Sequence, residues 1–315
     1  MALERTPAKV VKRSDLRSAL VVAAHVGFVL APVYLAAATA PSLLWLLCWV
    51  WFGLSMQGLL NLMHETAHLH VFRARRANEF LGRWLLGSLM FADFDRYREV
   101  HWAHHRNVGK EGDPKYSYKI DIRGWRFVLF VVRSVVLIEA IRKLRYVHGA
   151  AKPGEKSGTG RSWLMRAALV QSAFVSSLYL VSPGNRIDAL LHVVLVYGFV
   201  YFYGILSLTV MAANLRAIAE HQLADTQLEC SGLAALRNLT TTPLTWLVFG
   251  AYGFSDHATH HLNPAIPYYL LPAETQSLRA AQRAPDSGYF GMLVGIIGAR
   301  EHSRSVRSAR TLLMF

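Results

Sequence analysis

Four long apolar runs divide the chain, and each is long enough to cross a lipid bilayer. A membrane-spanning helix needs about 20 mostly apolar residues. The sequence therefore predicts an all-α integral membrane protein, with residues 1–315 forming a single domain. The runs that we expect to span the membrane are Ala19–Ala38, Leu43–Met63, Trp163–Val181 and Ala189–Ala212.

The beginning of the chain also resembles a secretory signal peptide. Basic residues precede the first apolar run, and Ala38-Thr39-Ala40 resembles a cleavage site. However, this run has the length of a membrane span, and a second apolar run follows it at once. The pattern therefore favours a membrane helix over a removable signal.

The segments between the spans predict a helical cap outside the bilayer, formed by residues 64–162 and 213–315. Phe80–Ala92 is apolar but too short to cross, which is typical of a re-entrant or interfacial helix. Trp125–Leu144 is interrupted by charged residues and suits a helix lying on the membrane surface. Residues 213–315 are mostly polar, with a helical pattern.

Basic residues lie on one side of the predicted spans. Segments 1–17, 64–162 and 213–315 contain 32 of the 34 Lys and Arg residues. Cytoplasmic segments of membrane proteins are enriched in Lys and Arg. We therefore expect both termini, including the N-terminal segment 1–17, and the whole cap to be cytoplasmic.

Composition supports a membrane protein and argues against two other classes. Hydrophobic residues make up 53% of the chain, and the mean hydropathy is +0.25. The net charge of +14 would suit nucleic-acid binding, but the basic residues avoid the apolar runs, as an orientation signal does, so we expect no nucleic-acid partner. The two cysteines, Cys48 and Cys230, are far apart and predict neither a disulfide framework nor a thiolate metal site.

Nine of the fourteen histidines lie in three clusters and one further position, and these nine fall on the predicted cytoplasmic side. Helix positions i, i+3 and i+4 share a face, so we expect each cluster to direct two or three imidazoles at one spot. Nine imidazoles are more than one metal ion can hold, which indicates two metal ions. The predicted ligands are His64, His68, His101, His104, His105, His221, His257, His260 and His261.

The residue types leave the metal and one alternative function open. Imidazole suits zinc, copper, iron and nickel, so the histidines do not identify the metal. His64-Glu65-Thr66-Ala67-His68 also matches the HExxH motif of zinc metalloproteases, in which the glutamate is the general base. A site of that kind needs three protein ligands rather than nine. A metal-binding membrane protein without catalysis is a further alternative.

Several carboxylates beside the predicted ligands complete the candidate site, whereas the other histidines lie outside it. A ligating histidine usually donates its second N–H group to a carboxylate, which fixes its tautomer. The candidates for this role lie within two residues of a predicted ligand: Glu65, Glu99, Glu220 and Asp256. We expect a structural or solvated role for the remaining histidines: His25, His70, His148, His192 and His302.

The boxes HxxxH, HxxHH and HxxHH, with Asn214–His221 between the second and third, resemble the membrane fatty acid desaturase and hydroxylase superfamily. The resemblance covers roughly residues 40–275. The stretch from His261 to Pro267 is similar to the bacterial members, which implies a bacterial plasma membrane. The resemblance further implies two histidine-bound iron ions, O2 as co-substrate and attack on an unactivated C–H bond. It also suggests Asn214 as a residue that aids one iron through water.

The function implied by the resemblance is desaturation of a fatty acyl or similar lipid-like chain. Gly112-Asp113-Pro114 also resembles carotenoid ketolases and hydroxylases, so hydroxylation or ketone formation on a lipid, carotenoid or natural-product intermediate is the main alternative. The sequence contains neither a nucleotide-binding glycine loop nor an HPGG haem-binding stretch. We therefore expect an external electron donor such as ferredoxin with its reductase.

Overall fold

The computed structural model describes residues 14–110, 112–115, 117, 120–149, 160–221, 236–282 and 288–299. Most of the basic segment 1–17 and His302 lie outside these residues, and so does the side chain of His148. The described residues fold into helices joined by short connections, with two isolated β-bridges.

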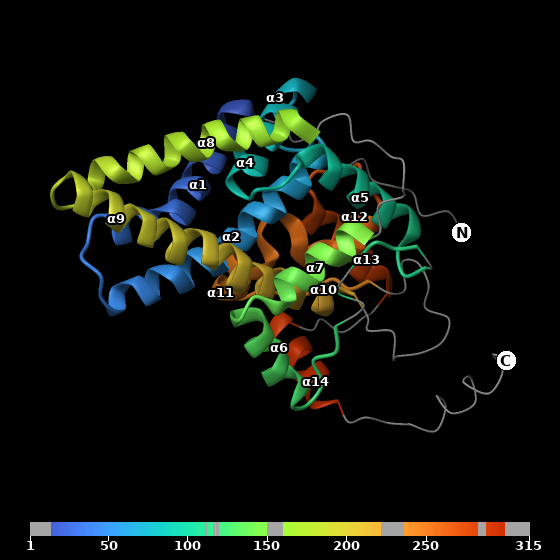
Figure 1. The fold of residues 1–315 in the computed structure, drawn as a ribbon. Coiled ribbons are helices and arrows are strands. Elements are labelled where there is room, and N and C mark those ends of the chain that lie inside the picture. Colours follow the sequence, from blue (N-terminus) through green and yellow to red (C-terminus); the bar gives the residue numbers. More distant parts are fainter. Residues whose placement is uncertain are drawn as a thin grey trace.

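Among the described residues, four helices are long and apolar enough to cross a membrane, which confirms the predicted number of spans. They are α1 (Asp15–Ala37), α2 (Leu43–Ala67), α8 (Gly160–Val181) and the continuous run Arg186–Glu220. Figure 1 shows these long helices extending to the left of the view and the shorter helices gathered at the right. They pack around a shared apolar core that includes Val33, Phe52, Leu178 and Val200.

Two of these helices continue beyond the predicted spans, and both carry residues of the candidate site. The fourth run comprises α9 (Arg186–Val196), two π-helical segments (Tyr197–Tyr203 and Ile205–Thr209) and α10 (Val210–Glu220). Its 35 residues would extend about 50 Å at the usual helical rise, against about 30 Å of hydrocarbon. The polar end therefore projects out of the bilayer, and it places Asn214 to His221 in the cap.

The segment Phe80–Ala92, expected to be a re-entrant or interfacial helix, is divided among three short helical elements. It contains the end of α3 (Arg75–Phe80), the π-helix η1 (Leu81–Leu86) and α4 (Gly87–Leu89). The side chains of Leu81, Leu86 and Leu89 are buried in the same core as α2. In addition, the Gln171 side-chain amide of α8 donates a hydrogen bond to the Ser88 carbonyl at 2.8 Å. The segment is thus packed into the helix bundle.

The segment Trp125–Leu144 forms two helices where one was expected. These are α6 (Arg126–Val135) and α7 (Ile138–Gly149), separated at Leu137, whose φ of +64° cannot continue a right-handed helix. Buried Glu139 of α7 forms an ion pair with Arg133 of α6 across this break at 2.7 Å, and a second ion pair with Arg142 of α7 at 3.4 Å. The bend is therefore fixed by an ion-pair network.

The C-terminal part of the chain completes the cap. After α5 (Phe94–Asn107), the site-bearing segments are the 3-10 helix η8 (Ala251–Asp256) and α12 (His257–Leu262). The remaining elements are α11 (Pro243–Thr245), the π-helix η7 (Trp246–Gly250), α13 (Leu271–Gln282) and α14 (Tyr289–Gly298). A second apolar core, which contains Ile122, Phe130, Ile218 and Tyr289, joins α6, α10 and α14.

Candidate metal centre

The structure brings all nine predicted histidines together in two adjacent groups. In each group, the potential ligand nitrogens lie within 4.8 Å of one another. The first group contains His64, His68, His101, His105 and His260. The second group contains His104, His221, His257 and His261.

The second and third histidine boxes each serve both groups: two imidazoles of each box converge on one group, as expected, and the third imidazole belongs to the other group. On α5, His101 and His105 join the first group, whereas His104 joins the second. On α12, His257 and His261 join the second group, whereas His260 joins the first. Positions i and i+4 are about 40° apart around a helix, but adjacent residues are about 100° apart. The i, i+4 pair therefore stays together, and the i+3 imidazole faces the other group.

In the second group, the Nε2 atoms of His104 and His221 face each other, and neither atom carries a proton. Asp113 accepts a hydrogen bond from His104 Nδ1 at 2.8 Å, and the Ala217 carbonyl accepts one from His221 Nδ1 at 3.0 Å. In neutral imidazoles the Nε2 atoms then carry lone pairs, and these two atoms are 3.3 Å apart. Ligand nitrogens about 2.0–2.1 Å from one cation would be about 3.0–3.4 Å apart. The donor set thus fits a bound metal ion.

The first group shows the same convergence. His101 Nε2 lies 2.6 Å from His68 Nε2 and 2.9 Å from His105 Nε2, and His105 Nε2 lies 3.3 Å from His260 Nε2. His64 donates its Nδ1–H to Glu65 at 2.8 Å, and its buried Nε2 has no hydrogen-bond partner among the described residues. Single protons cannot satisfy so many converging nitrogens, whereas a cation accepts several lone pairs at once.

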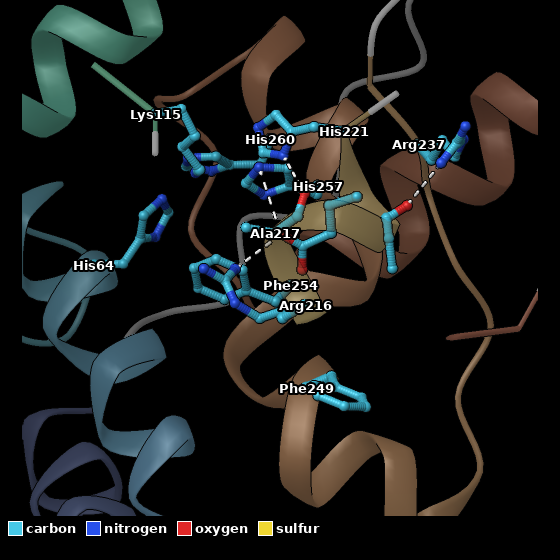
Figure 2. Close-up of polar contacts among 12 residues, drawn as sticks. His64, Lys115, Arg216, Ala217, His221, Arg237, Phe249, Phe254, His257 and His260 are labelled. Atoms are coloured by element: carbon cyan, nitrogen blue, oxygen red, sulfur yellow. Dashed lines mark hydrogen bonds and ion pairs between the residues drawn. The ribbon is translucent and has the colours of Figure 1, made fainter. Parts of the chain in front are cut away.

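Burial keeps these imidazoles in the form that binds metal. Metal ligation requires neutral histidine. Burial lowers the pKa of His105 to about 4 and holds the pKa of His104, His257 and His261 well below the usual range. Neighbouring positive charge, including that of Lys115 near His104, lowers them further. The imidazoles of the site are therefore neutral at physiological pH, as metal binding requires. Figure 2 shows His64, His221, His257 and His260 with Lys115 and Arg216 around them.

Two carboxylates hold candidate ligands by direct hydrogen bonds. Glu65 accepts from His64 Nδ1 and, through its other oxygen, from His70 Nδ1 at 3.2 Å. Asp113 accepts from His104, and sequence reasoning missed this role. The signal was present in Gly112-Asp113-Pro114, which follows the second box. His70, expected to be structural or solvated, is buried, and its bond to Glu65 makes its role structural.

The other predicted partners occupy different environments. Buried Glu220 accepts from Tyr289 Oη at 2.8 Å and from Arg216 at 2.9 Å, and it lies 3.7 Å from His257 Nε2. Asp256 accepts from the hydroxyl of the adjacent Ser255 at 3.1 Å, so a role through His257 stays a prediction.

The structure also places Asn214 and Glu99. Asn214 is buried, and its amide nitrogen has no hydrogen-bond partner among the described residues. The structure does not bring Glu99 to the site. Its side chain is 63% exposed and pairs with Arg96 at 3.2 Å. Glu99 precedes His101 by two residues on α5, so the two side chains point about 200° apart around the helix axis. Glu99 therefore faces solvent.

Two further side chains border the site without a signal in the histidine pattern. The Phe254 ring contacts His64, with ring centroids 4.6 Å apart, and stacks on His257 at 5.5 Å. It therefore contacts one histidine of each group. Lys115 Nζ lies 3.5 Å from His104 Nε2, and desolvation lowers the pKa of Lys115 to about 8.

The comparisons with known proteins agree with the site. A comparison with curated proteins gives no match. The model of the family "Fatty acid desaturase" matches residues 40–291, a range that includes all nine histidines. The match covers most of the chain, from the start of α2 to the start of α14. The chain therefore belongs to the fatty acid desaturase family.

Proposed function

We propose that this membrane oxidoreductase introduces a double bond into an aliphatic chain of a lipid-like substrate, with O2 as the oxidant. The observation that carries the proposal is the pair of adjacent imidazole groups supplied by shared helices. Overall, O2 takes up two hydrogen atoms from neighbouring carbons, together with two electrons and two protons from a donor, and leaves as two water molecules.

We assign one iron ion to each imidazole group. His64, His68, His101, His105 and His260 would hold the first, and His104, His221, His257 and His261 would hold the second. Two irons held there would supply the oxidising power that an unactivated C–H bond requires. The choice of iron follows from the family, because the imidazoles alone also suit zinc and copper.

The surrounding side chains orient the ligands. Glu65 and Asp113 accept the Nδ1–H groups of His64 and His104, so their Nε2 atoms face the site. Asn214, with a buried amide that lacks a protein partner, is our candidate to hold a water molecule beside one iron. We propose that Glu220 and Asp256 adjust the position of His257.

Electrons come from a separate protein in this proposal. The net charge of +14 is concentrated in the cap and near the termini. We place these segments on the cytoplasmic side of a bacterial plasma membrane. A basic surface attracts acidic partners and speeds their encounter. An acidic ferredoxin with its reductase is therefore the donor class that we propose.

The metalloprotease alternative is disfavoured by the contacts of Glu65. A general base must be free to take a proton from water, but both Glu65 oxygens accept from histidines. Hydroxylation and ketone formation remain the rival within the family, because they begin with the same hydrogen removal. The positions of the histidines do not distinguish these outcomes.

Product analysis tests the proposed function. The protein is reconstituted in lipid with iron, a ferredoxin system and O2, and lipid extract is added. Mass spectrometry then measures the masses of the products. We expect the loss of two hydrogens from an aliphatic chain, and no such product from His101→Ala. Gain of oxygen from the unmodified protein would replace desaturation by hydroxylation, and peptide cleavage would overturn the assignment.

A further inference from the structure

A pocket of about 570 Å³ lies between the first membrane helix and the segment that leads into the third histidine box. One wall is formed by α1 and the other by residues of η7, η8 and the connection to α13. Residues that represent the two walls are Ala24, His25 and Phe28 on one side, and Trp246, Tyr252 and Tyr268 on the other.

The pocket lies against apolar surface of the kind that faces lipid. Val21, on the α1 wall of the pocket, is 40% exposed, and Trp246 on the opposite wall is 50% exposed. The lining is chiefly apolar, which suits a hydrocarbon chain. Because one wall belongs to a membrane-spanning helix, such a chain can reach the pocket sideways from the bilayer.

The inner wall of the pocket continues into the candidate metal centre. Asp256 lines the pocket and is followed directly by His257 of the second group. Phe254, two residues earlier, contacts the rings of His64 and His257. A ligand in the pocket is therefore separated from both imidazole groups by a single short segment of chain.

One polar contact fixes this wall. Tyr252 Oη and His25 Nδ1 are 2.7 Å apart, and their rings stack. His25 is pressed against α2, since a Cβ atom at Gly58 would lie 2.6 Å from His25 Cε1. Tyr252 and Gly253 both have positive φ, 57° and 74°, so the turn that they form needs support. His25 is thus a positioning residue that ties η8 to the membrane helices.

We propose that this pocket holds the hydrocarbon chain of the lipid substrate, which enters from the bilayer between α1 and η7. That the bound lipid is the substrate rests on the proposed function. Binding of the hydrocarbon chain itself can be tested without turnover. It assigns to α1 a role in substrate binding beyond anchoring the protein.

A photoreactive fatty acid with a diazirine near the end of its chain tests the binding, using metal-free protein in lipid nanodiscs. We expect saturable labelling of the peptide that contains residues 252–272, which unlabelled fatty acid suppresses. Ala24→Trp fills the pocket and should lower this labelling about tenfold. Ala24→Leu should have a smaller effect in the same direction.

Ala23→Trp is the matched control. Ala23 is the exposed neighbour of Ala24 on α1 but does not line the pocket, so the same bulk there should leave the labelling unchanged. Equal labelling of Ala24→Trp and the unmodified protein would overturn the proposal. The melting temperature of each variant verifies that it is folded.

Measuring turnover alongside labelling distinguishes a failure of this inference from a failure of the proposed function. If the label follows the expected pattern but the unmodified protein oxidises no lipid, the pocket stands as a lipid site and the proposed oxidation fails. If the unmodified protein forms an alkene and Ala24→Trp forms it at the same rate, the pocket is not the substrate site, whereas the oxidation stands.

Discussion

His104 and His221 present two proton-free Nε2 atoms to each other at 3.3 Å, because the Nδ1 proton of each is held by a different acceptor. Two lone pairs at this distance repel each other unless a cation lies between them. The acceptors, Asp113 and the Ala217 carbonyl, are fixed by the fold. The folded chain therefore presents two converging lone pairs that a metal ion could bind.

The first prediction concerns metal content. We expect about two iron ions per chain in the unmodified protein, and about one or fewer after His221→Ala, because the second group loses a ligand on which its geometry depends. His192→Phe serves as the control, since His192 Nε2 bonds the Ala36 carbonyl far from either group. Elemental analysis by mass spectrometry measures the content. Full iron content in His221→Ala would remove this residue from the site.

The second prediction compares two acidic residues on either side of the second box. Asp113→Asn should lower metal affinity by about 10–100-fold, because His104 loses the carboxylate that orients it. Glu99→Gln should leave the affinity unchanged, since Glu99 faces solvent. A competition titration with a chelator measures both. Equal affinities in the two variants would contradict the role given to Asp113.

The third prediction concerns pH and the metal-free protein. Burial lowers the folded-state pKa of His105 from 6.5 to about 4, so below pH 6.5 the unfolded state takes up a proton that the folded state does not. Stability should therefore fall as the pH drops from about 6.5 to 4, by about 1.4 kcal/mol per pH unit for each such histidine. His105→Gln should show a shallower fall. Melting temperatures in detergent over this pH range measure the effect, and a flat profile would argue against neutral buried imidazoles.

The fourth prediction concerns membrane orientation. Accessibility tags at Arg5, Glu155 and Arg310 should all report the cytoplasmic side, and a tag at Asn185 should report the opposite side. Asn185 begins the fourth long helix, so it lies at the far end from the histidines. A cytoplasmic report from Asn185 would break the four-span arrangement.

The fifth prediction concerns electron supply. The rate with an acidic ferredoxin should fall as salt rises, because ions screen charge attraction over about 8 Å at physiological strength. A small artificial reductant needs no docking surface, so its rate should depend little on salt. Steady-state turnover with each reductant makes the comparison. A salt-independent rate with the ferredoxin would count against electrostatic docking.

The sequence predicted the spans and the nine histidines because both depend on local patterns. Apolar length identifies a membrane helix, and the spacing of histidines identifies a metal-binding face. The division of the second and third boxes between the two groups depends on the positions of neighbouring helices, which the spacing of histidines along one helix does not reveal.

The partners of the histidines were harder to predict for the same reason. Asp113 reaches His104 because the chain reverses after α5, with positive φ at Gly109 and Gly112. The Gly109 N–H donates to Asp113 Oδ2 and holds this turn. Glu99 is closer in sequence to a ligand but points away. Closeness in sequence to a ligand therefore did not predict which carboxylate contacts a histidine.

The way α5 serves both groups has a consequence for how the two metal sites can change. His104 and His105 are consecutive residues of one rigid helix, yet they belong to different groups. A rotation or shift of α5 moves a donor of each group at the same time, and α12 imposes the same constraint through His260 and His261. The spacing between the two imidazole groups is thus set in part by the helical turn that carries His104 and His105. A movement of either helix would therefore alter both groups together.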